Sequence, residues 1–307
     1  KLAEVVEIAD RVTVLRKGTR VTSMDRGSFD EKSLAHAMTG QERIQLPERR
    51  KNNNKNEVLA LEVRNLLVHS TIGDFNSVDD LSFHVAPGEI LGIAGVEGNG
   101  QREIVDCLFG LKTPDQGNIL IEERDVTESA PIVRRKAGLG AIPEDRQGLG
   151  LVLDMTIGEN IAMSKIISGK YSRIGLIKWG QVASDSVELL KEYDVRPPDP
   201  SVKTSSLSGG NQQKIVLARE MSTHPSILVA DNPTWGLDVG AIDYVHQRIL
   251  ELRDKGGAVL LLTLDLEELF KLSDRVLVLY RGRKTLEGLA AEVKGEKLAL
   301  AMAGGSK

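Results

Sequence analysis

The feature of this sequence that most constrains its fold is an internal repeat at an offset of 264 residues. Residues 2–18 (LAEVVEIADRVTVLRKG) align without a gap with residues 266–282 (LEELFKLSDRVLVLYRG), and eight of the seventeen positions are identical. At the same offset, five of seven positions agree between residues 34–40 (LAHAMTG) and 298–304 (LALAMAG). Two blocks at one offset are typical of a duplicated unit, although two unrelated helix–strand units of similar sequence are the alternative.

The repeat divides the chain into three parts. We predict that residues 1–40 are the C-terminal tail of a first module whose body lies upstream. Residues 41–57 include the stretch PERRKNNNKN, which is polar and low in complexity and therefore predicts a linker. Residues 58–304 are expected to form a complete second module.

Composition limits the classes of function. The chain has 307 residues, 41% of them hydrophobic, which is enough for a large buried core. The net charge of −4 gives no general basic surface, so we expect no nucleic-acid partner. The single cysteine, Cys107, excludes an internal disulfide and fits a reducing compartment. No apolar run has the length of a membrane span.

Short apolar runs mark the expected strands of the second module. A half-buried strand is predicted at 58–68, where apolar and polar residues alternate, and strands buried on both faces at 90–94, 227–230, 258–262 and 276–279. Helical segments alternate with these runs, which predicts an α/β core with a mostly parallel sheet. Residues 114–203 are longer and more helical, and we predict an inserted helical subdomain there.

A glycine-rich loop follows the strand at 90–94. Residues 95–102 read GVEGNGQR and lead into a helix predicted to begin at Gln101. In the pattern GxxxxGK[ST], glycines allow backbone N–H groups to surround a phosphate at the helix start, lysine contacts the outer phosphates and the hydroxyl binds Mg²⁺. The glycines are present here, but Gln101 replaces the lysine and Arg102 the hydroxyl. By itself this loop is equally compatible with an ordinary strand-to-helix turn.

Two further motifs narrow the interpretation. Residues 207–213 read LSGGNQQ, in which Ser208 and the two glycines can present a hydroxyl and N–H groups to a phosphate at a helix start. A serine that only caps a helix is the simpler alternative for Ser208. Residues 226–234 read SILVADNPT, a buried strand that ends in Asp231, whose carboxylate could bind Mg²⁺. The sequence GLD, ending at Asp238, follows.

The order of these motifs resembles that of the ABC ATPases over residues 58–304. More narrowly, GVEGNGQ (95–101), PEDR (143–146), LSGGNQQK and PTWGLDVG (233–240) resemble the fused double ATPases of prokaryotic sugar and nucleoside importers. The resemblance implies a P-loop NTPase core with an antiparallel β part and a helical subdomain at about 114–203. It also implies ATP and Mg²⁺ as cofactors, with each ATP held between the phosphate loop of one module and the LSGG segment of the other.

The resemblance further implies partners, a location and a set of site residues. The partners would be the first module, transmembrane permease subunits and, indirectly, a solute-binding protein, at the cytoplasmic face of the membrane. Asp231 would bind Mg²⁺. The residues expected to contact ATP are Gly95, Val96, Glu97, Gly98, Asn99, Gly100, Gln101, Arg102, Ser208, Gly209, Gly210, Asn211 and Asp238.

Four residues of the second module's own site differ from the family pattern at positions that bind phosphate or Mg²⁺ or take part in hydrolysis. Besides Gln101 and Arg102, Asn232 stands at the position of the catalytic glutamate and Leu264 at that of the switch histidine. An amide cannot act as a general base, and the loss of a positioned base costs about 10²–10⁴ in rate. The loss of the lysine removes a contact of about 1.5–3 kcal/mol. No catalytic residue of this site is therefore intact, and we expect the isolated chain to be inactive or very slow.

The LSGG segment is unaltered, so we expect it to complete the ATP site of the first module. Glu144, in PEDR, falls where the family has the glutamine that couples nucleotide to the membrane partner; a plain surface turn is the alternative. One other class of function is a soluble tandem ABC ATPase acting on the ribosome or DNA, which usually has a long charged linker or zinc-binding cysteines. Another is a non-catalytic regulatory module, against which the intact LSGG segment weighs.

Overall fold

In the computed structural model the described residues are 2–16, 19–30, 33–34, 37, 58–70, 73, 75–167, 169–173, 176–293 and 295–305. The predicted linker, 41–57, lies outside them. Within the described ranges, none of the helices combines the length and the apolar character needed to cross a membrane.

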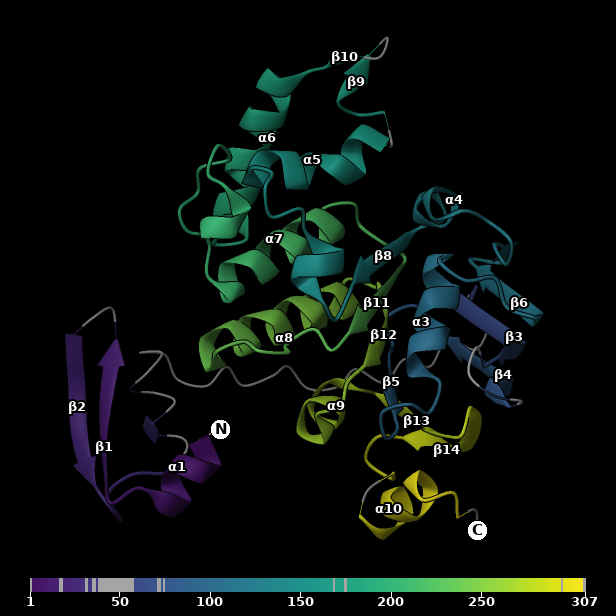
Figure 1. Cartoon of the computed structure of the whole chain (residues 1–307), viewed down its shortest axis with the longest axis horizontal. Coiled ribbons are helices and arrows are strands. Elements are labelled where there is room, and N and C mark those ends of the chain that lie inside the picture. The colour runs from purple at the N-terminus through teal and green to yellow at the C-terminus, as the bar shows by residue number, and fades with distance from the viewer. Residues whose placement is uncertain are drawn as a thin grey trace.

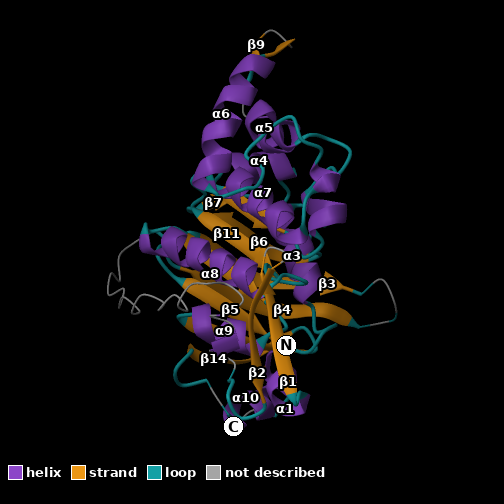
Figure 2. Ribbon diagram, turned by 90° about the vertical axis from the view of Figure 1, so that its left-hand side faces the viewer, coloured by secondary structure: helices purple, strands orange, loops and turns teal. Residues whose placement is uncertain are grey.

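A six-stranded sheet forms the centre of the fold (Figures 1 and 2). Its strand order is β14-β13-β5-β12-β11-β8, and all neighbours are parallel except the edge strand β14. The five residues of β5 and the five of β12 are all buried, because helices or the second sheet cover both faces. The strands are β5 (Ile90–Ala94), β8 (Leu139–Ile142), β11 (Ile227–Asp231), β12 (Ala258–Leu262), β13 (Arg275–Tyr280) and β14 (Arg283–Leu289).

A second, antiparallel sheet of four strands has the order β4-β3-β6-β7. Helix α3 (Gln101–Phe109) buries Ile104, Cys107 and Leu108 in a core shared with apolar residues of both sheets. The fold class predicted from the sequence, an α/β core with a mostly parallel sheet and an antiparallel β part, is thus confirmed. The antiparallel strands are β3 (Leu61–His69), β4 (Asn76–Val85), β6 (Gln116–Ile121) and β7 (Arg124–Asp125).

Helices pack on the other face of the central sheet. The core there joins β8, β11 and β12 to α5 (Ile157–Ile167), α6 (Trp179–Glu192), α7 (Gly209–Met221) and α8 (Val239–Asp254). Figure 1 shows α5 and α6 above the sheet, with the short hairpin of β9 (Ser172–Arg173) and β10 (Leu176–Ile177) at their outer end.

The helical subdomain occupies less of the chain than the predicted range of 114–203. The first part of that range contains β6, β7, helix α4 (Pro131–Lys136) and β8, whose strands belong to the two sheets. A π-helical turn (Arg146–Gly150) follows, and helix α5 begins at Ile157. The difference arises because β6 and β8 are only six and four residues long, and so short a run carries little periodicity.

The internal repeat is also a repeat of structure. Helix α1 (Leu2–Ile8), β1 (Arg11–Arg16) and β2 (Thr19–Asp25) have the bounds of α9 (Leu266–Leu272), β13 and β14 shifted by 264 residues. Both hairpins contain an irregularity at the same place, between Val14 and Leu15 and between Val278 and Leu279. Their surroundings differ, because β13 also pairs with β5, whereas β1 pairs with β2 alone among the residues described. Leu279 is fully buried in the core cluster between the two sheets, while Leu15 is 66% exposed.

The last described helix, α10 (Glu296–Met302), packs on β13 and β14.

Candidate nucleotide site

The glycine loop connects β5 to α3, the place of a phosphate loop in a parallel sheet. Gly98 and Gly100 have φ angles of +85° and +103°, which L side chains rarely adopt. A side chain at Gly100 would also collide with the backbone oxygen of Ser77. The helix begins at Gln101, as predicted, so its first N–H groups face the loop.

The side chain of Gln101 fills the loop from within. Its Oε1 accepts a hydrogen bond of 3.1 Å from the backbone N–H of Asn99, and its Nε2 donates to the carbonyl oxygen of Val96 at 3.1 Å. A Cβ added to Gly95 would lie 2.6 Å from Nε2, so the amide also occupies the space beside the first glycine. We call these two hydrogen bonds the Gln101 latch. The N–H of Asn99, which a bound phosphate would use, is already bonded to the chain's own side chain.

Asn99 fixes the rest of the loop. Its Nδ2 donates to the carbonyl oxygen of Val96 at 2.8 Å, and its Oδ1 accepts from the N–H of Arg281 at 2.6 Å. The backbone oxygen of Asn99 accepts from Gly282 at 3.1 Å. The loop is thereby tied to the turn between β13 and β14. Of the remaining predicted contact residues in this loop, Val96 and Glu97 are exposed.

Asn232, at the position of the catalytic glutamate, bridges three loops. Its Nδ2 lies 3.3 Å from Oε1 of Glu144 and 3.2 Å from Oδ1 of Asp231. Its Oδ1 accepts a 3.0 Å hydrogen bond from the N–H of Leu264. A glutamate could not donate to Glu144, whereas an amide both donates and accepts. The structure therefore gives Asn232 a connecting role and brings Glu144 and Leu264 to the end of β11.

These residues line one side of a cavity of about 770 Å³ beside the glycine loop. Burial, followed by the negative charge of Glu144, raises the pKa of Asp231 to about 7. Arg102 faces the same cavity and partly opposes this shift. Among the predicted site residues, those that line the cavity are Glu97, Gly98, Gly100, Gln101, Arg102, Asp231, Asn232 and Leu264.

The cavity is a poor match for Mg²⁺. Arg102 supplies only N–H donors, and a positive charge, at the position where the motif has a hydroxyl ligand. Across the described part of the chain there is no group of three or more His, Cys, Asp or Glu side chains arranged to hold a metal ion. This cavity therefore lacks the hydroxyl ligand that a P-loop Mg²⁺ site uses.

Sequence reasoning missed a buried network next to the cavity. Glu268 on α9 accepts hydrogen bonds from the hydroxyls of Thr234 and Thr263 at 2.7 Å each, and from Nε2 of His246 at 2.8 Å. Glu268 and His246 are each only 3% exposed. Thr234 follows β11 and Thr263 follows β12, so one carboxylate holds the two loops together. The only signal in the sequence is that Glu268 falls on the side of α9 that faces the core. The residues that bind this carboxylate could not be predicted, because Thr234 and His246 are distant from it in the sequence.

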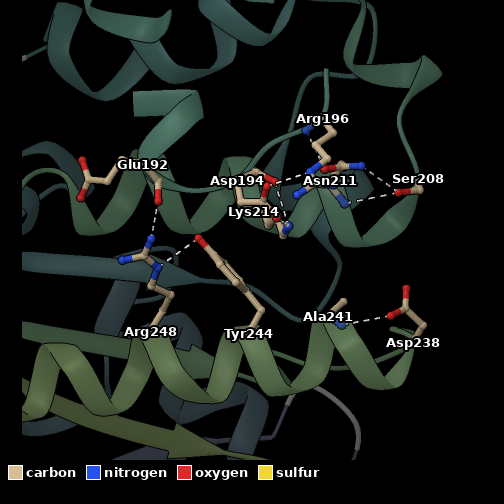
Figure 3. Close-up of polar contacts among 10 residues, drawn as sticks. All are labelled: Glu192, Asp194, Arg196, Ser208, Asn211, Lys214, Asp238, Ala241, Tyr244 and Arg248. Atoms are coloured by element: carbon tan, nitrogen blue, oxygen red, sulfur yellow. Dashed lines mark hydrogen bonds and ion pairs between the residues drawn. The ribbon is translucent and has the colours of Figure 1, made fainter. Parts of the chain in front are cut away.

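The LSGG segment lies at the start of α7 (Figure 3), and none of residues 208–211 lines the cavity. Ser208 is exposed and is the N-cap of this helix. Asn211 donates from Nδ2 to Oγ of Ser208 at 3.2 Å. A Cβ at Gly210 would lie 3.1 Å from that of Ala241, and Asp238 caps α8 by accepting from the N–H of Ala241 at 3.0 Å. The predicted residues Ser208, Gly210, Asn211 and Asp238 are thus brought together, with Asp238 as a helix cap.

Arg146, in PEDR, is a further residue that sequence reasoning did not single out. Its Nη1 donates to the carbonyl oxygen of Trp235 at 2.8 Å. A Cβ at Gly209 would lie only 2.7 Å from Nη2, so the guanidinium lies against the first glycine of the LSGG segment. The neighbouring Gln147 donates to Oε1 of Gln212 at 2.9 Å. The turn after β8 therefore packs directly on the start of α7.

The mostly parallel sheet, the glycine loop between β5 and α3, and the acidic end of β11 define a nucleotide-binding protein of the P-loop class. The model of the ABC transporter family matches residues 78–235, about half of the chain. The chain belongs to the ABC transporter family, as an ATP-binding domain.

Individual relatives agree with this membership. The guanosine import ATP-binding protein NupO of Bacillus subtilis is 42% identical over 98% of this chain and 58% of its own length. The nucleoside import ATP-binding protein NupA of Lactococcus lactis is 38% identical, and the ribose import ATP-binding protein RbsA of Oceanobacillus iheyensis 37% identical, each over 100% of this chain and 60% of its own length. The chain thus spans about three fifths of the length of these relatives.

Solved structures agree at the level of the fold. MJ1267, an ATP-binding cassette of an ABC transporter, matches 81% of this chain and 98% of its own with a TM-score of 0.68 at 22% identity. The dimeric cassette MJ0796 bound to ADP and Pi matches 76% of this chain and 99% of its own, with a TM-score of 0.64 at 23% identity.

Proposed function

We propose that this chain is the second nucleotide-binding module, with the tail of the first, of the ATP-binding subunit of an importer for a nucleoside or sugar. The observation that carries the proposal is an asymmetry within one module. The chain's own phosphate loop is filled by Gln101, whereas Ser208 is exposed on an unaltered LSGG segment. We assign residues 1–40 to the first module, 41–57 to a linker and 58–304 to the second module.

The tandem arrangement is supported by the structural repeat. Helix α1 with β1 and β2 reproduces α9 with β13 and β14, including the irregularity in the hairpin. Leu15 is 66% exposed, whereas Leu279 is buried in a core cluster that also contains Leu91 and Ile93 of β5. A first module with its own β5 equivalent would pair with the open edge of β1 and would supply the core that covers Leu15.

Each module would contribute a different part of the ATP site. Ser208, Gly209 and Gly210 would meet the phosphates of an ATP held, with its Mg²⁺, by the phosphate loop of the first module. The contributions of this chain are a hydroxyl group and the N–H groups at the start of α7, where the helix dipole favours a negative charge. The second site, beside the Gln101 latch, would bind nucleotide weakly, and Asn232 and Leu264 provide no base there.

The transported compound and the partners are proposed from the relatives. The relatives of 42% and 38% identity are named for guanosine and nucleoside import, and another for ribose import. An importer subunit of this kind would sit at the cytoplasmic face of the membrane, bind transmembrane permease subunits and act indirectly with a solute-binding protein. Closure of the two modules on ATP would then move the permease.

The test is ATP hydrolysis by the full-length protein and by the isolated chain. We expect negligible hydrolysis by the isolated chain and clear hydrolysis by the full-length protein. Ser208→Arg in the full-length protein should remove most of the turnover, because the arginine fills the position at which a phosphate is to be met. Gln101→Ala should change turnover far less. Equal losses from the two substitutions, or vigorous hydrolysis by the isolated chain, would contradict the proposal.

A further inference from the structure

The segment that joins α6 to the LSGG helix is held firmly at both sides (Figure 3). Lys214 on α7 donates to the backbone oxygen and to Oδ2 of Asp194, both at 2.8 Å. Arg248 on α8 donates to the backbone oxygen of Glu192 and stacks on the ring of Tyr193, with 4.5 Å between the guanidinium carbon and the ring centroid. The end of the helical subdomain is therefore fixed to α7 and α8, and with it the backbone N–H of Arg196.

That N–H group determines how the Asn211 side chain is turned. The backbone N–H of Arg196 donates to Oδ1 of Asn211 at 2.9 Å. If the amide were rotated by 180°, its NH₂ group would face the N–H of Arg196, and two donors would oppose each other. The contact with Arg196 therefore directs Nδ2 of Asn211 toward Ser208, to whose Oγ it donates at 3.2 Å.

The hydroxyl group of Ser208 can act only as a hydrogen-bond donor toward a ligand. Its oxygen accepts from Nδ2 of Asn211 at 3.2 Å and from the backbone N–H of Asn211 at 3.5 Å. A hydroxyl has two acceptor lone pairs and one donor hydrogen. With both lone pairs used, the hydrogen points away from Asn211. Within the described ranges it meets no acceptor, so it is available to an incoming anionic oxygen.

We propose that Asn211 is a positioning residue, which sets the hydroxyl of Ser208 as a donor to ATP phosphate and links it to the end of α6 through Arg196. The sequence pattern assigned Asn211 to ATP contact; the structure assigns it to Ser208 instead. This inference rests on the proposed function, in which Ser208 meets the ATP of the first module.

The experiment measures KM and kcat for ATP in the full-length protein, with single and double variants. Asn211→Leu keeps the branched shape of the side chain, adds no charge and removes the hydrogen bond to Ser208. We expect it to raise KM about 3- to 10-fold, as the loss of one hydrogen bond does, with kcat nearly unchanged. Ser208→Ala should have an effect of similar size. The double variant should be no worse than Ser208→Ala alone, because Asn211 acts through Ser208.

Gln181→Leu is the matched control. Gln181 is an exposed amide on α6 away from the LSGG segment, and its replacement should leave KM and kcat unchanged. Asn211→Leu also removes the acceptor of the Arg196 N–H, but both lost contacts are exposed, so its thermal unfolding midpoint should stay within a few degrees of that of the control.

The outcomes separate the inference from the function on which it rests. If Ser208→Ala leaves KM unchanged, the proposed function is overturned. If Ser208→Ala raises KM and Asn211→Leu does not, the positioning role is overturned. If the two single effects multiply in the double variant, Asn211 acts independently of Ser208, and the inference is also wrong.

Discussion

Removal of the Gln101 latch is expected to increase the affinity of this chain for ATP, although Gln101 stands at a position that normally contacts phosphate. The Asn99 N–H can bind a phosphate only after its hydrogen bond to Oε1 of Gln101 breaks, and the Gln101 side chain leaves the loop only after its bond to Val96 breaks as well; each bond is 3.1 Å long. Each neutral hydrogen bond is worth about 0.5–1.5 kcal/mol, so the latch opposes binding by about 1–3 kcal/mol. Since 1.4 kcal/mol is a factor of ten, Gln101→Ala should bind ATP about 5- to 150-fold more tightly than the wild type.

The assay is calorimetric or fluorescence titration of the purified chain with ATP, with and without Mg²⁺. Gln101→Lys should bind more tightly than Gln101→Ala, because the lysine adds a charged contact of about 1.5–3 kcal/mol. Gln181→Ala, a change of an exposed amide on α6, is the matched control and should leave the affinity unchanged. If Gln101→Ala binds ATP no better than the wild type, or if Gln101→Lys shows no binding, the latch does not oppose nucleotide binding.

Two further predictions concern buried groups. Glu268→Ala leaves the donors of Thr234, Thr263 and His246 without their acceptor. The free energy of unfolding in urea should therefore fall by about 3–5 kcal/mol. A fall below about 1 kcal/mol would contradict a stabilising role of Glu268. Burial alone would raise the pKa of Glu268, but these hydrogen bonds lower it below 4.5. The contribution of Glu268 to stability is therefore present above pH 4.5 and is lost as the pH falls through the lowered pKa. In that acidic range the difference in unfolding free energy between wild type and Glu268→Ala should shrink. Burial raises the pKa of the Cys107 thiol from 9.0 to about 11, so the native thiol should be alkylated at pH 8 at least about 100-fold more slowly than in guanidinium chloride. Equal rates in the two conditions would place Cys107 outside the core.

The parts of the fold that could be predicted have strong local signals. The strands at 90–94 and 258–262 and the helix start at Gln101 lie at the predicted residues, because a short apolar run next to glycine fits little other than a buried strand. The strands β6 and β8 were included in the predicted helical range, since their partners, β3 and β11, are distant in the sequence. Strand pairing of this kind is a property of the sheet and not of the segment.

In the candidate site, too, the residue types could be predicted from the sequence, whereas their contacts could not. The replacements at Gln101, Arg102, Asn232 and Leu264 are visible in the motifs, and with them the absence of the usual lysine, hydroxyl, base and histidine. Their present contacts are not visible there. Asn232 meets Glu144 across 88 positions and Leu264 across 32, so its bridging role exists only after β8, β11 and β12 are side by side.

The sequence by itself determined two things: the family, through the order of its motifs, and the repeat of residues 2–18 at 266–282. Residue identity and spacing along the chain are sufficient for both. Only the tertiary structure decided that Gln101 fills its own phosphate loop and that Asn211 is turned toward Ser208 by the backbone of Arg196. The physical reason is that a hydrogen bond depends on distance and direction between two groups. For Asn211 those quantities are set by the packing of α6 against α7, and for Gln101 by the folded path of the loop between β5 and α3.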